Sequence, residues 1–261
     1  MVKLDSVRLS RLFPSSVSQI EKTISEEFTK YDISLMSNKR VSRNMALSVA
    51  RHSVSLEYGV SYPFFSRSKY DSANLSEIVE RRYKSHLNAW DYALETIGKT
   101  QRYGDKELNV LAKILEPNQE IHPLKGYRMG SVRISGATHD IPEDVEIPEE
   151  IFNLISKVNT IPSPLGKAIY SHFHIARIHP FSDGNGRVAR IVQNSLLCGS
   201  GKLPINIKVY QRDLYISILD DAVNDYYSGR ETYLHTFSEF LVQNLYFELE
   251  NYKQNHNRRK K

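Results

Sequence analysis

Residues 163–190 read Ser163-Pro-Leu-Gly-Lys-Ala-Ile-Tyr-Ser-His-Phe-His-Ile-Ala-Arg-Ile-His179-Pro-Phe-Ser-Asp-Gly-Asn-Gly-Arg-Val-Ala-Arg190. This stretch predicts two helices joined by a short loop. A serine followed by a proline is a strong start signal, because the serine side chain can cap the helix and proline suits the first helical position. Pro180 discourages the first helix from continuing through His179. The second helix is expected over residues 187–197.

Helical periodicity also prevails in the rest of the chain. Apolar residues recur at helical intervals over residues 40–58, 75–97, 105–115, 149–158 and 209–252. Gly98 is expected to end the second of these helices, and Asp105 to cap the third. Only residues 127–135 alternate in part between apolar and polar side chains, so a short β-hairpin flap is expected there. The predicted fold class is mainly α, a helical bundle with this one short flap.

No internal repeat or low-complexity linker divides the sequence. We expect an N-terminal helical region at residues 1–70, a core at residues 71–215, and a helical extension with a basic tail at residues 216–261. All three are expected to form one compact unit. A chain of 261 residues with 40% hydrophobic content can bury a substantial core without disulfides.

Composition limits where the protein works and what it contacts. Cys198 is the only cysteine, so no intrachain disulfide can form, and a reducing compartment is the simplest expectation. No apolar run approaches the ~20 residues that cross a bilayer. A soluble cytoplasmic protein without membrane contact is therefore expected. The net charge of +5 comes partly from the tail at residues 255–261, which is typical of a solvated end, so nucleic acid is not an expected partner.

The loop between the two central helices carries groups that suit phosphate. Gly184-Asn185-Gly186 tolerates positive φ, so the chain can turn and present successive backbone N–H groups. These groups come directly before a helix N-terminus, whose partial positive charge also attracts anions. Arg187 and Arg190 follow on one face of that helix. Two guanidinium groups beside an anion-binding turn suit a polyphosphate better than a single carboxylate.

Two further side chains complete a set for group transfer at phosphorus. His179, with an ordinary pKa of ~6.5, can act as a base for a hydroxyl nucleophile at neutral pH. Asp183 offers the carboxylate that Mg²⁺ on phosphates usually takes from a protein. Taken singly, the histidine, the glycine-rich loop and the arginines would indicate a structural helix end, an ordinary loop and a solvated face. Their occurrence together within twelve residues favours a catalytic nucleotide site.

The segment from His179 to Arg190 resembles the signature of the Fic family, HPFxDGNGRxxR, with every defining position filled. The likeness extends to the helix that begins at Pro164 and to residues 126–136, which resemble the family's substrate-facing flap. Residues 75–200 match the family in layout. The resemblance implies a Fic-type helical bundle. It also implies an enzyme that transfers AMP from ATP to a Ser, Thr or Tyr hydroxyl of a protein and releases pyrophosphate.

The resemblance gives each residue of the signature an expected role. His179 would deprotonate the incoming hydroxyl, and Asp183 would hold Mg²⁺, which Mn²⁺ can replace, on the phosphates. The residues that would bind the ATP phosphates are Gly184, Asn185, Gly186, Arg187 and Arg190. The flap residues that would dock the target protein are Tyr127, Arg128, Val132, Arg133 and Ile134. Doc-type relatives, which transfer phosphate, carry Ala and Lys in place of Gly184 and Gly186, so the two glycines favour transfer of AMP.

A helix upstream of the signature resembles the inhibitory pattern of many Fic proteins, a Ser or Thr four residues before a Glu that is followed by Gly or Asn. Ser53 and Glu57 fill the first two places and lie on one helical face, while Tyr58 stands where the Gly or Asn is usual. The resemblance implies that Glu57 pairs with Arg190 and so excludes productive ATP. Autoinhibition by this pair is expected.

The sequence is also compatible with other functions. The same site could remove AMP with water as the nucleophile, or transfer another nucleotide or phosphate-containing group. A metal hydrolase built on His172, His174, His179 and Asp183 is disfavoured, because helical residues two positions apart diverge in direction. A non-catalytic nucleic-acid or protein binding module would use the basic tail and the C-terminal tyrosines. The expected partners are ATP, an unidentified target protein and the chain itself through automodification, with a homodimer as a further candidate.

Overall fold

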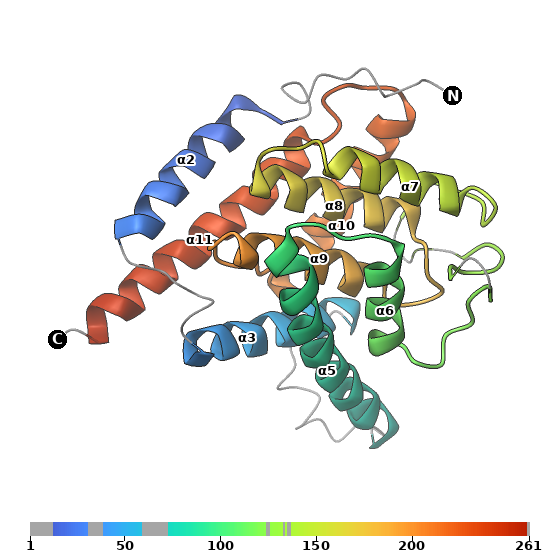
Figure 1. Cartoon of the computed structure of the whole chain (residues 1–261), viewed down its shortest axis with the longest axis horizontal. Coiled ribbons are helices and arrows are strands. Elements are labelled where there is room, and N and C mark those ends of the chain that lie inside the picture. The colour runs from blue at the N-terminus through green and yellow to red at the C-terminus, as the bar shows by residue number, and fades with distance from the viewer. Residues whose placement is uncertain are drawn as a thin grey trace.

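A computed structural model describes residues 13–30, 39–58, 73–123, 126–132, 134 and 137–259 of the chain. In chain order the elements are α2 (Ser15–Lys30), α3 (Lys39–Tyr58), α5 (Ala73–Ala93), the π turn η2 (Leu94–Gly98), α6 (Asp105–Leu115), α7 (Ile147–Val158), α8 (Pro164–Ile178), α9 (Asn185–Gly199), the 3-10 turn η3 (Val209–Gln211), α10 (Arg212–Tyr227) and α11 (His235–Arg259) (Figure 1). The mainly α prediction is confirmed. The predicted hairpin does not appear in residues 126–132 or at residue 134, which are irregular.

The centre of the molecule is the helix pair α8 and α9. Apart from Lys167, every residue of α8 from Leu165 to Ile178 is buried, and α9 is buried almost as completely. A helix that is buried on all sides must be enclosed by other helices. α5, α6 and α7 pack on the pair, and α10 and α11 reach it through Tyr215 and Phe237, which contact the His172 ring (Figure 1). The loop that joins α8 to α9 is therefore fixed at both ends by the core.

Local signals set both ends of α8, as the sequence predicts. At the start, Ser163 accepts a hydrogen bond from the Gly166 N–H at 2.8 Å, and Pro164 is the first helical residue. At the end, His179 adopts a left-handed conformation with φ 52° and ψ 56°, which residues other than glycine rarely do. Pro180 follows and has no N–H with which to continue the ladder. The chain thus leaves the helix at His179.

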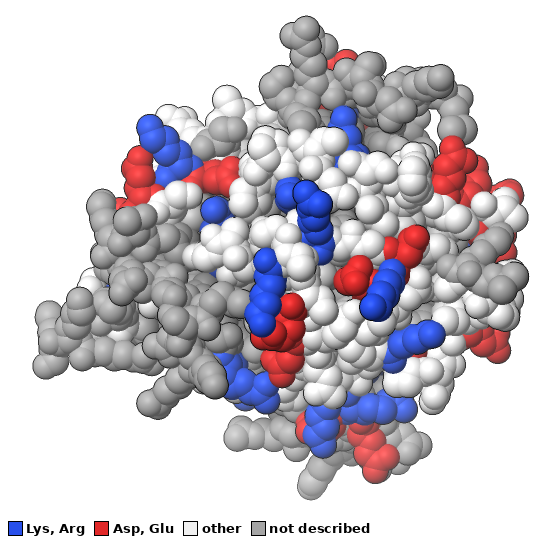
Figure 2. All heavy atoms as spheres, in the orientation of Figure 1, with Lys and Arg blue, Asp and Glu red and all other residues white. Residues whose placement is uncertain are grey.

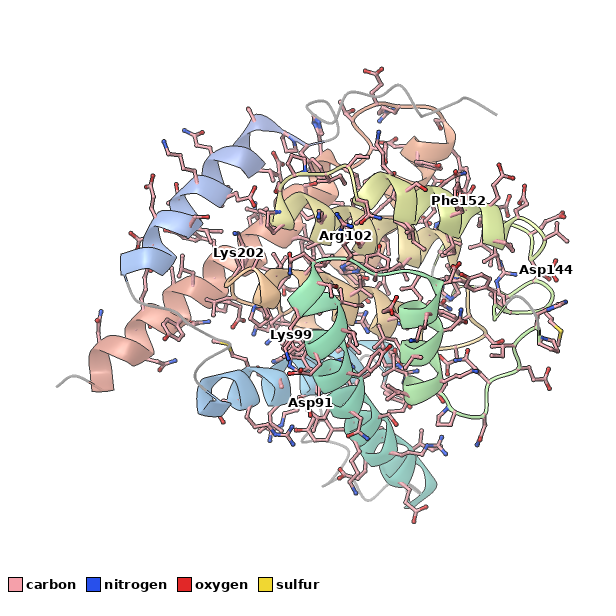
Figure 3. The ribbon with its side chains drawn as sticks, in the orientation of Figure 1. Asp91, Lys99, Arg102, Asp144, Phe152 and Lys202 are labelled. Atoms are coloured by element: carbon pink, nitrogen blue, oxygen red, sulfur yellow. The ribbon has the colours of Figure 1, made fainter. Side chains whose placement is uncertain are left out.

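The prediction that Gly98 ends its helix is wrong. After α5 the chain continues through η2 and two more helical residues, Lys99 and Thr100. Gly98 lies where η2 crosses the end of α9, because a Cβ on Gly199 would come within 2.0 Å of the Gly98 carbonyl oxygen. Figure 3 shows Lys99 and Lys202 near this crossing. The glycines allow two helices to approach closely, a use that one sequence does not distinguish from a helix stop.

The start of α6 also differs from its prediction. The residue before the helix is Gly104, and its N–H donates to the Glu107 carboxylate at 2.9 Å. Asp105, the expected cap, is the first helical residue and accepts a hydrogen bond from the Tyr127 hydroxyl. Asp105 therefore connects α6 to the segment that follows it. Its side chain accepts the bond from Tyr127 and does not cap the helix.

The outer helices and the surface complete the description. α2 lies along α11, and Lys253 on α11 is paired with Glu27 on α2 at 2.5 Å (Figure 1). On the face drawn in Figure 2, the basic side chains of the described residues stand singly among acidic and uncharged ones. Within the described ranges, no helix combines the length and the apolar character that crossing a membrane requires.

Candidate active site

A cavity of about 390 Å³ lies between the loop that joins α8 to α9, the end of α3, α10 and the residues Ile134, Ala137 and His139. Its charged lining comes from the loop and from α3, α5, α9 and α10, and includes Glu57, Arg82, Asp183, Arg190, Arg212 and Asp220. Its apolar lining comes mainly from α10 and includes Ile216, Leu219 and Val223 on that helix, together with Ile134 and Ala137. Such a pocket suits a ligand that is charged at one end and flat and apolar at the other.

His179 lines this cavity at the end of α8. Its Nδ1 lies 3.2 Å from the Ala176 carbonyl oxygen. A carbonyl can only accept, so Nδ1 carries the proton and Nε2 is the basic nitrogen. Burial lowers the pKa of His179 to about 4, and the positive charge of Arg128 contributes in the same direction. The imidazole is therefore neutral near pH 7 and able to take up a proton.

The N-terminal end of α9 has the geometry of an anion-binding turn. Gly184 precedes the helix with a φ of 83°, which glycine adopts without strain. The first bond of the ladder runs from the Val188 N–H to the Gly184 oxygen at 2.9 Å, so the N–H groups of residues 185–187 come before the ladder. A Cβ on Gly186 would lie 3.0 Å from Nη1 of Arg190. A larger residue there would displace this arginine.

The Asn185 side chain holds the loop closed. Its oxygen accepts a hydrogen bond from the Phe181 N–H at 2.8 Å, and its nitrogen donates to the Phe181 carbonyl at 2.7 Å. Both residues are buried. The side chain that the resemblance assigns to phosphate is thus engaged inside the loop, and Asn185 offers a ligand its backbone N–H.

Arg187 and Arg190 are both buried, and both are engaged by α3. Arg190 donates to the Ser53 hydroxyl at 2.8 Å and to the Ser53 carbonyl at 3.0 Å, whereas the nearest Glu57 oxygen lies 3.7 Å away. Arg187 donates to Glu57 at 2.7 Å and to Glu116 at 2.8 Å. Glu57 therefore pairs more closely with Arg187 than with the expected partner Arg190, which Ser53 holds.

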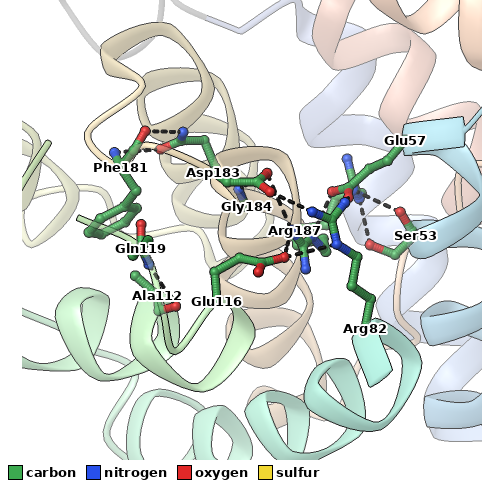
Figure 4. Close-up of polar contacts among 12 residues, drawn as sticks. Ser53, Glu57, Arg82, Ala112, Glu116, Gln119, Phe181, Asp183, Gly184 and Arg187 are labelled. Carbon is green, nitrogen blue, oxygen red and sulfur yellow. Dashed lines mark hydrogen bonds and ion pairs between the residues drawn. The ribbon is translucent and has the colours of Figure 1, made fainter. Parts of the chain in front are cut away.

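A third arginine joins this network from α5. Arg82 donates to Glu57 at 3.2 Å and to Asp183 at 2.6 Å, and its Nε lies 2.9 Å from Glu116. Figure 4 shows the three carboxylates converging on Arg82 and Arg187 from α3, α6 and the loop. The sequence analysis missed Arg82 and Glu116, because neither belongs to a local pattern. The only local feature of Glu116 is its place between a helix end and a proline.

Asp183 is the candidate metal ligand, and its carboxylate is half-exposed. One oxygen accepts a hydrogen bond from the Gly184 N–H at 2.6 Å, and the other accepts from Arg82 at 2.6 Å. Among the described residues, no cluster of three or more His, Cys, Asp or Glu side chains could bind a metal ion. A single carboxylate beside a helix N-terminus fits Mg²⁺ that is bound mainly through phosphates and water, once Arg82 has moved aside.

Arg128 fixes the segment after α6 to the loop that joins α8 to α9. This buried side chain donates to the carbonyl oxygens of His179 at 2.9 Å and Pro142 at 2.5 Å. Its backbone N–H donates to the Pro180 carbonyl at 2.8 Å. Arg128, an expected target-docking residue, is therefore a support of the loop on which His179 lies.

The other expected docking residues fall into three groups. Tyr127 is buried, and its ring packs 6.1 Å from that of Phe181. Val132 and Ile134 are partly exposed, and Ile134 lines the cavity. Arg133 lies outside the described residues. Of the described members of this set, Ile134 is thus the one that borders the cavity.

The other histidines of α8 are used in the core. His172 contacts Gln193 at 2.5 Å through Nδ1 and the Tyr215 hydroxyl at 2.9 Å through Nε2. His174 contacts the Tyr233 hydroxyl at 3.1 Å. Both are fully surrounded by protein partners, which leaves no basis for a metal site shared with His179.

Comparison with known proteins shows what the region around this site is similar to. The sequence profile of the Fic/DOC family matches residues 82–197. A protein from Nematostella vectensis named protein adenylyltransferase Fic is 39% identical over 105 residues, which are 39% of this chain and 25% of that protein. A protein of the same name from Aedes aegypti is 27% identical over 195 residues, which are 72% of this chain and 39% of that protein. The chain thus spans a quarter to two fifths of the length of these relatives.

Solved structures share the fold. A Fic family protein from Desulfovibrio desulfuricans G20 matches with a TM-score of 0.72 at 17% identity, over 93% of this chain and 75% of that chain. Fic-1 from C. elegans matches with a TM-score of 0.67 at 14% identity, over 93% of this chain and 73% of that chain. The profile match runs from Arg82 in α5 to Leu197 in α9 and includes the whole loop that joins α8 to α9. Residues 82–197 of this chain are thus similar to the Fic/DOC family.

Proposed function

We propose that the chain transfers AMP from ATP to a Ser, Thr or Tyr hydroxyl of a protein and releases pyrophosphate. The observation that supports this most is His179, whose basic nitrogen is Nε2 and which lines a cavity that is also lined by the N-terminal end of α9. A hydroxyl beside Nε2 and phosphates at the helix end would meet in one site. The relatives from Nematostella vectensis and Aedes aegypti are named protein adenylyltransferases, which agrees with this proposal.

In the proposed reaction, the target hydroxyl gives its proton to Nε2 of His179 while its oxygen bonds to the α-phosphorus. The bond from the α-phosphorus to the bridging oxygen breaks, and pyrophosphate leaves with that oxygen. The N–H groups of residues 185–187 and the guanidinium groups of Arg187 and Arg190 would bind phosphate oxygens and stabilise the developing negative charge. Asp183 would hold Mg²⁺, or Mn²⁺ in its place, and the metal would neutralise phosphate charge.

Residues 126–134 would dock the target protein. They border the cavity at Ile134, and Arg128 fixes their start against the catalytic loop. An extended target segment that pairs with backbone groups here would be held with little dependence on its side chains. This would bring different hydroxyl-bearing residues, including those of the chain itself, to His179.

The contacts of α3 support autoinhibition. Ser53 and Glu57 occupy the two arginines that a triphosphate would use, and Arg82 occupies the Asp183 carboxylate. ATP and Mg²⁺ would therefore compete with contacts inside the protein. A bias of a few kcal/mol toward the occupied state is enough for strong repression. The chain would act slowly until the end of α3 moves or is altered.

The test is incubation with ATP labelled at the α-phosphate and Mg²⁺, using the wild type, Glu57→Gly and His179→Ala. We expect weak labelling of the wild type, stronger labelling of Glu57→Gly and none of His179→Ala. Equal labelling of wild type and Glu57→Gly would contradict the inhibitory role of Glu57. Labelling of His179→Ala would contradict the catalytic role of His179. The alternative function is removal of AMP from a protein, with water as the nucleophile. In that case wild-type protein would release the label from Glu57→Gly protein that has been labelled beforehand.

A further inference from the structure

His139 and Asp220 form a second polar pair in the lining of the cavity, on its α10 side. Asp220 accepts hydrogen bonds from the Thr138 N–H at 2.9 Å, the Thr138 hydroxyl at 2.5 Å and the His139 N–H at 3.2 Å. It also lies 2.5 Å from Nδ1 of His139. The carboxylate thus fixes both the backbone and the ring of His139, and the proposed transfer of AMP gives this pair no role.

The hydrogen bonds show which ring nitrogen of His139 has no partner within the described part of the chain. Burial raises the pKa of Asp220, but the hydrogen bonds from Thr138 and His139 outweigh it and hold that pKa below its usual value. Asp220 is therefore a carboxylate at neutral pH and can only accept. Nδ1 of His139 must carry a proton, so in the neutral ring Nε2 is an acceptor.

Nε2 of His139 is buried and has no hydrogen-bond partner among the described residues. The His139 side chain is 4% exposed, so bulk water does not reach it freely. Native proteins pair nearly all buried polar atoms, and an unpaired one in the wall of a cavity is an expected contact for a ligand. A group in the cavity that donates a hydrogen bond would give Nε2 of His139 the partner that these residues do not supply.

The neighbours of the pair indicate which part of a nucleotide this group belongs to. Asp220 shares α10 with the apolar lining residues Ile216, Leu219 and Val223. Arg190 and the N–H groups that suit phosphates come from α9, and Arg212 lines the cavity at the start of α10. A bound nucleotide with its phosphates at α9 would place its nucleoside against the α10 wall. A nucleoside carries two kinds of donor, the ribose hydroxyls and the exocyclic amine of the base.

We propose that His139 is a specificity-determining residue whose Nε2 accepts a hydrogen bond from a nucleoside donor, a ribose hydroxyl or the exocyclic amine. Asp220 is its positioning residue. This inference rests on the proposed function, because it takes the ligand of the cavity to be an adenine nucleotide.

Two substitutions separate ligand binding from support of the fold. His139→Asn keeps an N–H near the Nδ1 position, which can still donate to Asp220, but it has no atom at the Nε2 position. His139→Ala removes both. A purely structural role predicts that His139→Asn behaves like the wild type, whereas a ligand contact predicts that it binds as weakly as His139→Ala. Thermal unfolding of each variant shows whether it is folded.

The measurement is calorimetric titration of the wild type and both variants with Mg²⁺ and ADP, whose binding needs no contact to a γ-phosphate. We expect both variants to bind ADP about three- to tenfold more weakly, the range for one hydrogen bond. Titration with 2′-deoxy-ADP, 3′-deoxy-ADP and the diphosphate of unsubstituted purine riboside identifies the donor. One of them should bind the wild type more weakly than ADP does, and His139→Asn should bind it as it binds ADP.

The proposal is overturned if folded His139→Asn binds ADP like the wild type, or if it still discriminates against every analogue. Undetectable binding of ADP by the wild type would also overturn it. The proposed function fails in a different way, by the absence of label from α-labelled ATP in Glu57→Gly. Loss of AMP transfer together with His139-dependent ADP binding would leave this inference intact.

Discussion

The loop that joins α8 to α9 and the end of α3 border the same cavity but are held by different kinds of contact. The loop is fixed by hydrogen bonds to backbone groups, from Asn185 to Phe181 and from Arg128 to the His179 carbonyl. The end of α3 is held by charged side chains, and Glu57 is 21% exposed where it meets Arg187. The loop's partners cannot be replaced by a ligand, whereas those of α3 are the groups that a phosphate would seek.

This difference suggests that the loop sets the geometry of the site, whereas the end of α3 sets whether a ligand can enter it. A loop held by buried backbone bonds keeps the same shape whether or not a ligand is present. A helix end held by ion pairs at a cavity wall can be displaced by an anion that offers the arginines better partners. The account therefore predicts that changes in the loop destroy activity or stability, and that changes at α3 release activity.

Removal of the base should have the largest effect. His179→Ala should lower AMP transfer about 100- to 10,000-fold, because general base catalysis contributes that much. His179→Asn is the matched control, since its amide can still donate to the Ala176 carbonyl but offers no basic nitrogen. Initial rates of labelling in the Glu57→Gly background measure both. Activity within tenfold of the parent in either variant would contradict the role of His179.

Release of α3 should come next. Glu57→Gly should raise labelling at least about tenfold, since each 1.4 kcal/mol of lost bias is worth a factor of ten. Ser53→Ala should release less activity, because Arg190 keeps the Ser53 carbonyl as a partner. Arg82→Gln should also raise labelling, because it frees Asp183. A fall in labelling of Arg82→Gln would show that Arg82 serves ATP and not the restraint.

Removal of the loop's internal bonds should appear as lost stability. Asn185→Ala should lower the free energy of unfolding by about 2 kcal/mol, because it leaves the buried Phe181 N–H and carbonyl without partners. Asn244→Ala on α11 is a matched control, because Asn244 is equally buried but makes one bond to a carbonyl inside its own helix. Urea unfolding compares the two. Equal losses would mean that the Asn185 bonds have no special weight in the loop.

A further prediction is a dependence of stability on pH. Burial lowers the pKa of His172 to about 3 and that of His179 to about 4, whereas an unfolded histidine has a pKa of about 6.5. The unfolded chain therefore takes up protons first, and the free energy of unfolding should fall as pH drops from about 6.5 toward 4. Urea unfolding at intervals across this range measures the slope. A free energy of unfolding that stays constant would contradict the neutral buried state of these rings.

Helices with local signals could be predicted from the sequence. Ser163-Pro164 and Pro180 mark the two ends of α8 without reference to the rest of the fold, and both ends are where they were expected. The prediction of a helix end at Gly98 is wrong because the role of Gly98 is to allow close contact with Gly199, which is distant in the sequence. The same limit applies to Asp105, whose partner is Tyr127.

The candidate site was predicted only as far as it is local. Residues 179–190 form one continuous segment, so their chemistry could be assembled from spacing alone. Arg82 and Glu116 enter the site from α5 and α6, and only the packing of those helices brings them to Arg187. His139 and Asp220 likewise meet across 81 positions of the chain. Charges that act through tertiary contacts leave no pattern in one sequence.

The central claim is that the site transfers the α-phosphate of ATP with its nucleoside. The most direct test incubates Glu57→Gly with Mg²⁺ and ATP labelled either at the α-phosphate or at the γ-phosphate. The account predicts that the protein retains label from the α-position and none from the γ-position, and that His179→Ala in the same background retains neither. Retention of γ-label would mean transfer of phosphate, and the absence of both labels from Glu57→Gly would contradict the account.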